Sequence, residues 1–304
     1  MNRRDALRSA AAAFATLAAS STFPLGWSAR SDEKKKRKLL VFTRSAGFEH
    51  SVVKLGPDGT CLVDRIFKKL GAEHGFDVHC TKDGRIFLPE TLKQFDAIFF
   101  YTTEDLTREG GDKQPPMPPE GKQALLDFVA SGKGFVGAHC ASDTFHSAER
   151  GWKNNPPEQQ DPYIRMLGGE FVRHGEQQKA WMRVVSPNFP GLQSVKDFQL
   201  FEEWYSLKNF APDLHVILVQ DTQGMKNLDY QRPNFPATWA RMHQKGRVFY
   251  TSMGHREDVW ENPLFQQILL GGLSWAFGNV DADVTPNLEK VAPQAYVLPD
   301  PNKK

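Results

Sequence analysis

The first half of the chain alternates short apolar runs with segments whose apolar residues recur every three or four positions. Apolar runs of strand length lie at 38–43, 96–102 and 134–139, with a shorter one at 76–81. "CLVDRIFKKLGAEHG" and "PPEGKQALLDFVASGKG" each place their apolar residues on one helical face and end at glycine. The pattern therefore predicts strands and helices in alternation.

Strands that alternate with helices form a parallel sheet with helices on both faces, so we predict an α/β fold. Ligands of such sheets bind at the edge where the carboxyl ends of the strands meet. Each of the three strongly apolar strands is followed by polar residues suited to a site: "TRSAGFEH", "TTED" and "HCASDTFH". We expect the functional residues to come from these segments.

The second half of the chain has a less regular pattern. "YIRMLGGEF" is typical of a helix that ends at paired glycines, and "NPLFQQILLGGLSWAFG" predicts a closing amphipathic helix. Strands are predicted at 179–186, 215–220, 237–242 and 246–253, the last two joined as a hairpin. There is no internal repeat or clear linker, which favours one domain.

The composition, with 40% hydrophobic and 24% charged residues among 304, is that of an ordinary soluble chain. A net charge of +2 without a long basic stripe argues against a nucleic acid or a membrane surface as partner. The absence of a Cys-x-x-Cys motif excludes the usual zinc ribbon and dithiol redox site. We expect Cys61, Cys80 and Cys140 to be free, mostly buried thiols.

The first 30 residues have the pattern of an export signal. Arg3 and Arg4 precede the short apolar run "AAAFATLAAS", as in signals of the twin-arginine route, which exports folded proteins. An uncleaved anchor is the alternative. We therefore expect a periplasmic or otherwise exported protein with no membrane span in its mature chain. The expected boundaries are an export signal at 1–30, a basic linker at 31–37, one domain at 38–278 and a tail at 279–304.

"GFVGAHCASD" predicts a strand followed by a sharp turn, as at the nucleophile elbow of many hydrolases. Amidotransferases of flavodoxin-like fold carry their cysteine at this elbow in a G-x-C-x-G setting. That register places His139 at the elbow and Cys140 one position beyond it, with no glycine two residues after the cysteine. A cysteine hydrolase is therefore disfavoured. Asp143 could orient His139 or serve as the N-cap of a following helix.

Four histidines stand beside glycines at predicted strand ends or turns: His50, His139, His174 and His255. A neutral imidazole serves either as a general base or as a metal ligand. None of the four has the short spacing of a local zinc motif, so a metal site would be assembled from distant loops. Each of them alone could instead be an ordinary loop histidine. Their shared placement favours a site, which requires His139 and His255 to lie within about 10 Å of each other.

"FEEWYSL" places Glu202, Glu203, Trp204 and Tyr205 together. Acids beside aromatic residues are typical of carbohydrate sites, where a carboxylate moves a proton and a ring stacks on the sugar. An alternating edge strand with one acid turned inward is the structural alternative.

Five segments resemble the trehalose-utilisation (ThuA-like) family, in family order, over about residues 38 to 278. They are "LLVFTRSAGFEH", "GFVGAHCASDTF", "MLGGEFVRHG", "EEWYSL" and "VFYTSMGHREDVWENPLFQQILLGGLSWAFG". The chain departs from the family pattern at Cys140, where alanine is common, and after His174, where "GEQQ" replaces the usual His-Pro.

The resemblance implies a flavodoxin-like fold similar to that of class I glutamine amidotransferases, without their catalytic cysteine. It also implies a role in disaccharide catabolism through 3-keto sugars. The residues of this chain that match the family pattern are His50, His139, Asp143, His174, Glu203, Tyr205 and His255.

Together these features lead to the hypothesis of an exported enzyme that cleaves 3-keto glycosides by hydrolysis or elimination. We assign His139, oriented by Asp143, as the base, Glu203 as the acid or its partner, and His255 as a further catalytic residue. Substrate contacts are assigned to His50, His174, Trp204 and Tyr205. A divalent metal such as zinc on His50, His139 and His255 is left open, as is a homo-oligomer. The alternative is a non-catalytic carbohydrate-binding protein on the same fold.

Overall fold

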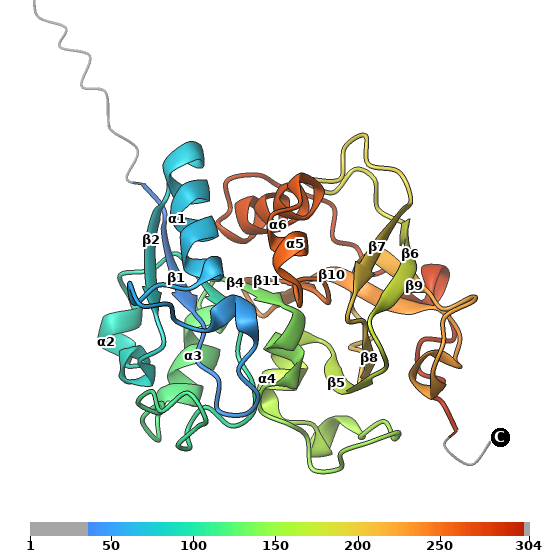
Figure 1. The fold of residues 1–304 in the computed structure, drawn as a ribbon, viewed down its shortest axis with the longest axis horizontal. Coiled ribbons are helices and arrows are strands. Elements are labelled where there is room, and N and C mark those ends of the chain that lie inside the picture. The colour runs from blue at the N-terminus through green and yellow to red at the C-terminus, as the bar shows by residue number, and fades with distance from the viewer. Residues whose placement is uncertain (1–35, 301–304) are drawn as a thin grey trace, which may run out of the picture. The chain divides into compact units, whose positions relative to one another are not determined.

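The computed structural model describes residues 36–300, in which a nine-stranded sheet lies between two layers of helices (Figure 1). The strand order is β2-β1-β3-β4-β11-β10-β9-β6-β7. Pairing is parallel from β2 to β11 and antiparallel from β11 to β7. The strands of the parallel half are β1 (Lys38–Phe42), β2 (Asp77–Thr81), β3 (Ala97–Phe100), β4 (Gly134–Ala138) and β11 (Gly246–Thr251).

The antiparallel half extends the sheet beyond β11. It consists of β10 (Phe235–His243), β9 (His215–Asp221), β6 (Gln178–Val184) and the edge strand β7 (Phe198–Glu202). A separate two-stranded sheet pairs β5 (Glu170–His174) with β8 (Tyr205–Lys208). The α/β fold with a parallel sheet is thus confirmed, and the strand order of its parallel half is the flavodoxin-like one. The sheet is parallel only in that half.

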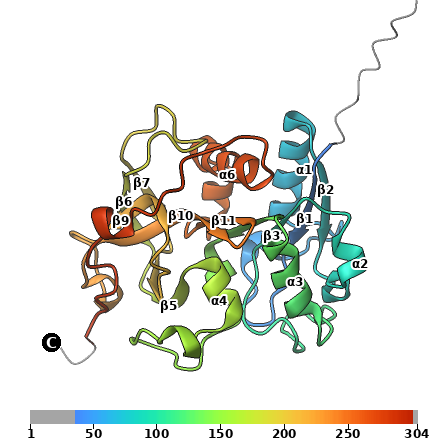
Figure 2. The same ribbon diagram turned by 180° about the vertical axis from the view of Figure 1, so that it is seen from behind.

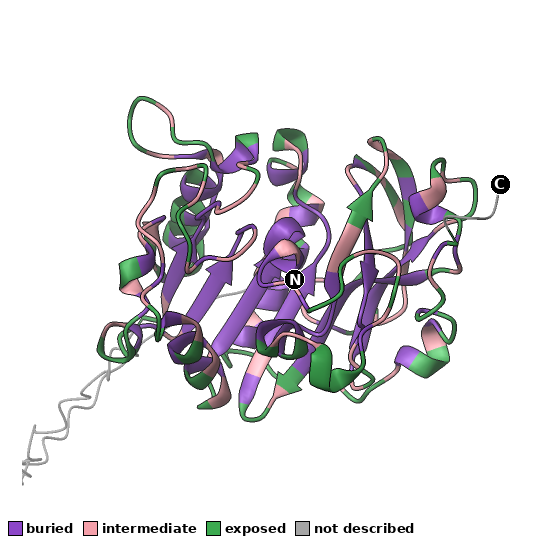
Figure 3. Ribbon diagram, turned by 90° about the horizontal axis from the view of Figure 1, so that it is seen from below, coloured by how far each residue is buried: buried purple, intermediate pink, exposed green. Residues whose placement is uncertain are grey.

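Helices cover both faces of the sheet, as predicted. One face carries α1 (Leu62–His74), α5 (Glu257–Trp260) and α6 (Pro263–Ala276), and the other carries α2 (Pro89–Leu92), α3 (Gly121–Ala130) and α4 (Pro162–Leu167) (Figures 1 and 2). Because helices screen them on both sides, β3 and β4 are buried along their whole length, whereas the edge strand β7 alternates (Figure 3). The expected hairpin joins β10 and β11.

Local signals place both ends of α1 where the sequence predicted them. The Cys61 thiol accepts a hydrogen bond from the Asp64 amide, and the Asp64 carboxylate accepts one from the Cys61 amide, a reciprocal cap at the start of α1. Gly75, at a φ of +77°, ends α1. In α6, Gly272 lets the helix press on the Phe249 ring, where a Cβ would lie 2.6 Å from ring atoms. The three cysteines are free, and only Cys80 is not fully buried, as expected.

The described part of the C-terminal tail packs on the domain. It includes α7 (Leu288–Val291), and the Asn287 side chain exchanges hydrogen bonds with both backbone groups of Val216 in β9. Arg232 donates a hydrogen bond to the carbonyl of Ala295. The expected export signal and nearly all of the basic linker lie outside the described residues. Within 36–300, no helix is long and apolar enough to cross a bilayer.

Candidate active site

The central strand β4 ends in a sharp turn at His139. This residue has a φ of +44°, a left-handed conformation that residues with a side chain seldom adopt, and it opens the 3-10 turn His139–Asp143. Such backbone strain persists only where the surrounding structure holds it, and it gathers at functional sites. The elbow expected from the sequence is present, and a histidine occupies it.

One hydrogen bond orients the imidazole of His139. Its Nδ1 lies 3.0 Å from the carbonyl oxygen of Ser252, and because a carbonyl only accepts, Nδ1 carries the proton. The other nitrogen, Nε2, is buried and has no hydrogen-bond partner. The ring of Tyr205 lies against the imidazole, with 3.9 Å between centroids. His139 therefore offers a lone pair, which suits it to bind a metal or a proton.

The predicted support of His139 by Asp143 is wrong. Asp143 Oδ1 lies 2.9 Å from Nε2 of His146 instead. No α-helix begins at Asp143, which is the last residue of the 3-10 turn, so the N-cap prediction is wrong as well. Asp143 contacts His146 in the following loop. The carbonyl of Ser252 therefore orients His139 instead.

Two further imidazoles lie beside His139, each after another parallel strand. The ring centroids of His50, His139 and His255 are 5.1–5.2 Å apart in every pair. His255 follows Gly254, whose φ of +117° turns the chain sharply after β11, as the sequence predicted. His50 ends the loop after β1. The requirement that His139 and His255 lie within 10 Å of each other is met.

The carboxylate of Glu203 reaches the histidines from the antiparallel half. Its Oε1 lies 3.1 Å from Nδ1 of His255 and 3.6 Å from Nε2 of His139. Its Oε2 lies 3.5 Å from Nδ1 of His174, whose side chain is 43% exposed. His50, His139, His255 and the carboxylate thus form one cluster, and His174 lies at its solvent side.

Glu202 fastens this carboxylate to the turn that carries His255. Its fully buried carboxylate accepts hydrogen bonds from the backbone amides of Gly254, His255 and Glu203, at 2.9, 3.1 and 2.8 Å. Burial raises the pKa of Glu202 to about 7, although these amides act against the shift. Sequence reasoning did not assign Glu202 this role, because the adjacent acids alone do not show which one faces the cluster.

Trp204 is not available to a sugar, contrary to its predicted role. It is fully buried, and its indole N–H donates to the carbonyl of Gln178. The Tyr230 hydroxyl donates to the Trp204 carbonyl at 2.6 Å. An aromatic residue that follows an acid can be a stacking surface or an anchor, and here it anchors the segment that holds Glu203. Tyr205 is also buried and contributes its ring to the wall behind His139.

Burial and charge determine the protonation of the cluster. Burial, with the neighbouring His139 and His255, lowers the pKa of His50 to about 2. Burial also lowers the pKa of His139 despite the nearby Glu203. At Glu203 burial opposes ionisation, but the adjacent imidazoles of His139 and His255 lower its pKa overall. At neutral pH the cluster therefore contains neutral His50 and His139 beside an anionic carboxylate.

These residues fit a divalent metal ion. His50 Nδ1, His139 Nε2 and His255 Nδ1 are buried nitrogens without hydrogen-bond partners. The four ligand atoms, one from each of these histidines and one from Glu203, lie within 4.8 Å of one another. Neutral imidazole and carboxylate are ligands of zinc, and a ligating histidine usually donates its other N–H to a carbonyl, as His139 does to Ser252.

A family model for trehalose utilisation matches residues 38–276. The chain belongs to the ThuA family. A ThuA-like protein from Bacteroides uniformis has a similar structure, with a TM-score of 0.59, 20% identity and coverage of 83% of this chain and 95% of that one. A second, from Parabacteroides merdae, has a TM-score of 0.56, 15% identity and coverage of 87% and 97%. No curated protein matches the chain.

At these identities the two structures establish the ThuA-like fold. The family match adds that members take part in sugar utilisation. All residues of the histidine cluster lie inside the matched range.

This ThuA-family chain has a second cluster, which sequence reasoning missed. His146 lies between three carboxylates, at 2.9 Å from Asp143, 3.3 Å from Glu170 and 3.8 Å from Glu104. Arg150 makes two hydrogen bonds to Glu104, of 2.9 and 2.6 Å. Although burial acts against the charge, Asp143 and Glu170 raise the pKa of His146 to about 9. The polar segment "TTED" after β3 pointed to this edge of the sheet but did not single out Glu104.

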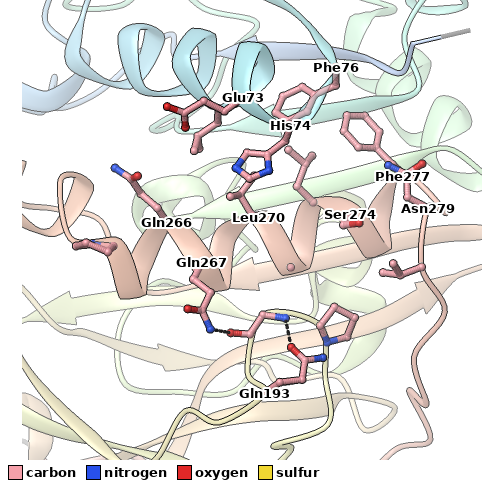
Figure 4. Close-up of a pocket in the computed structure, with 17 residues that line it drawn as sticks. Glu73, His74, Phe76, Gln193, Gln266, Gln267, Leu270, Ser274, Phe277 and Asn279 are labelled. Carbon is pink, nitrogen blue, oxygen red and sulfur yellow. Dashed lines mark hydrogen bonds between the residues drawn. The ribbon is translucent and has the colours of Figure 1, made fainter. Parts of the chain in front are cut away.

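A hollow of about 710 Å³ lies between α1 and α6, away from both clusters (Figure 4). His74 and Glu73 at the end of α1 and Leu270 of α6 line it, and Gln267 donates a hydrogen bond to the carbonyl of Gly191 at its border. The end of α1 precedes β2, which places this hollow at the amino ends of the parallel strands. Ligands of such sheets bind at the opposite edge, so the histidine cluster is the better candidate site.

Cys140 should prove chemically inert. It is 1% exposed, and burial raises the pKa of its thiol well above the ordinary value, so the reactive thiolate is not formed near neutral pH. Iodoacetamide at pH 7.5 should modify Cys140 in urea but not in the native protein, as measured by mass spectrometry. Rapid modification of native Cys140 would contradict the assignment.

The charge on His146 should make its contribution to stability depend on pH. Its pKa is about 9 in the folded protein, above the usual 6.5 of the unfolded chain. The stabilisation is therefore fully present below about pH 6.5 and is lost as the pH rises through about 9. His146→Gln should lower the free energy of unfolding by about 1–3 kcal/mol at pH 7, with most of the difference gone at pH 9.5.

Urea denaturation at the two pH values measures this effect. His79→Gln is the matched control, because burial lowers the pKa of His79 and its neutral form persists over this range. A His146→Gln difference that does not change with pH would refute the charged assignment.

Proposed function

We propose that this ThuA-family protein is an enzyme that cleaves 3-keto glycosides at the histidine cluster with the help of a divalent metal ion. The observation that carries the proposal is the convergence of three imidazoles, two of them buried, each with a buried nitrogen that makes no hydrogen bond, on one carboxylate. A protein that only binds sugar has no need for this cluster, because hydroxyl groups are recognised by partnered polar groups and aromatic rings.

The chemistry follows from the ketone. A carbonyl at C3 acidifies the proton on C2, and the glycosidic oxygen on C1 is a leaving group one carbon further on. Removal of the C2 proton lets its electron pair form a C1–C2 double bond as the C1–O bond breaks, and the leaving oxygen takes up a proton. The products are an unsaturated keto sugar and an alcohol. Addition of water to the double bond afterwards would make the overall result hydrolysis.

Glu203 is the group best suited to remove the C2 proton. Its carboxylate is anionic, since His139 and His255 lower its pKa overall, and its side chain is 12% exposed, so a substrate can approach it. This assignment replaces His139 as the base, because His139, His50 and His255 offer ligand atoms that lie within 4.8 Å of one another. The three histidines would hold the metal.

A bound divalent ion would act as a Lewis acid on the C3 carbonyl oxygen. Glu202 and the Ser252 carbonyl hold Glu203, His255 and His139 in place, so the cluster is preorganised before substrate enters.

We also propose export by the twin-arginine route, on the pattern of Arg3, Arg4 and the apolar run that follows.

The test is turnover of 3-keto-trehalose by zinc-loaded protein, measured as the release of glucose. We expect turnover that a chelator abolishes and added metal restores. Glu203→Gln keeps the size of the side chain but removes the base, and it should lower kcat by about 100-fold or more. Glu176→Gln is the matched control on an exposed loop acid and should leave kcat unchanged.

Two results would contradict the proposal: no turnover with any divalent metal, or full activity in Glu203→Gln. If the protein binds the sugar without turning it over, the alternative hypothesis of a non-catalytic carbohydrate-binding protein holds instead.

A further inference from the structure

A smaller hollow of about 240 Å³ lies at the same edge of the sheet as the histidine cluster. Residues that line it include Phe48, Glu104, Asp143, His146, Arg150 and Phe171. They come from the loops after β1, β3 and β4 and from strand β5, so the parallel-strand edge that carries His50 and His139 also forms this hollow.

Aromatic rings connect the hollow to the cluster on two sides. The Phe48 ring lies 4.9 Å from that of His50. The Phe171 ring lies 4.0 Å from that of Tyr205, which in turn lies 3.9 Å from His139. A ligand group in the hollow would therefore be about one ring away from the point where the histidines converge.

Phe48 is a large apolar side chain left 69% exposed on a fixed backbone. The Thr103 hydroxyl donates to the Phe48 carbonyl and accepts from the Gly47 amide, both at 3.1 Å. Gly47 itself packs on the side chain of Glu104, where a Cβ would lie only 2.5 Å from Cγ. An exposed ring on a fixed loop beside a cavity presents a flat apolar face on which a ligand ring can stack.

The polar lining is held in place and keeps spare hydrogen-bonding capacity. Arg150 and Glu104 hold each other through two hydrogen bonds, which leaves further guanidinium donors and carboxylate lone pairs unused. Nε2 of His146, whose side chain is 8% exposed, lies close to Asp143 but makes no hydrogen bond of good geometry. The hollow thus presents donors and acceptors side by side.

This combination selects the chemistry of the ligand. Two acids face one arginine and a protonated histidine, so the lining favours neither an anion nor a cation. Hydroxyl groups satisfy both donors and acceptors, and an aliphatic ring face suits Phe48. The volume is below the range of about 300–1,000 Å³ for a whole drug-sized ligand, so it fits part of one.

We propose that this hollow binds the neutral sugar ring that is joined to the reacting keto sugar, with Phe48 as the stacking surface and Glu104 and Arg150 as hydroxyl partners. The inference rests on the proposed function for the identity of the reacting ring, but it makes a separate claim about binding. The substrate class is thereby narrowed to disaccharides and glycosides with a ring-shaped leaving group.

Binding of trehalose, which lacks the ketone, tests the claim apart from catalysis. Isothermal titration of the zinc-loaded wild type should show saturable binding. Phe48→Ala should weaken it by about five- to tenfold. Glu104→Gln, which removes a charge but little volume, should also weaken it. Trp181→Ala, at another exposed aromatic residue on β6, is the matched control and should bind like the wild type. Equal zinc content in all four proteins confirms that the cluster is intact.

Kinetics on 3-keto-trehalose give the second readout. Phe48→Ala should raise KM by a similar factor. Wild type that does not bind trehalose, or Phe48→Ala that binds it equally well, would overturn the subsite whether or not turnover is seen. Phe48-dependent trehalose binding without turnover would support the subsite and count against the proposed reaction instead.

Discussion

The site depends on one constraint: two buried imidazoles and a third that is 18% exposed surround one carboxylate. Desolvation makes His50 and His139 neutral, and Glu203 stays ionised only because histidines surround it. Unpartnered buried nitrogens cost free energy, so a fold retains them where they bind something. A metal ion bound to all three nitrogens would remove this cost. No hydrogen bond within the chain does so.

The architecture explains how residues more than 200 positions apart reach one point. The parallel half places the ends of β1, β4 and β11 at one edge, and each end supplies a histidine. The antiparallel half brings the acidic segment back to this edge. There the buried carboxylate of Glu202 ties the chain around Glu203 to the amides beside His255. Fold and site are thus coupled through backbone hydrogen bonds.

The parallel half and the histidines could be predicted because both rest on robust signals. Buried strands show as apolar runs, and such strands end at a common edge, which marked His50, His139 and His255. The partners were harder. Asp143 was misassigned because a 3-10 turn and a helix start have the same sequence signals over so few residues. Trp204 was misassigned because composition does not show which face of an aromatic segment is buried. The His146 cluster depends on contacts between loops, which one-dimensional patterns do not encode.

Direct measurement of metal binding tests the central claim most sharply. Protein stripped with a chelator, dialysed against zinc and analysed by mass spectrometry of the metal should hold roughly one ion per chain. His50→Ala and His139→Ala should each abolish stable retention, whereas His243→Ala, on β10 and outside the cluster, should retain zinc like the wild type. A wild type that retains no divalent metal, or a His139→Ala variant that retains as much as the wild type, would contradict the account.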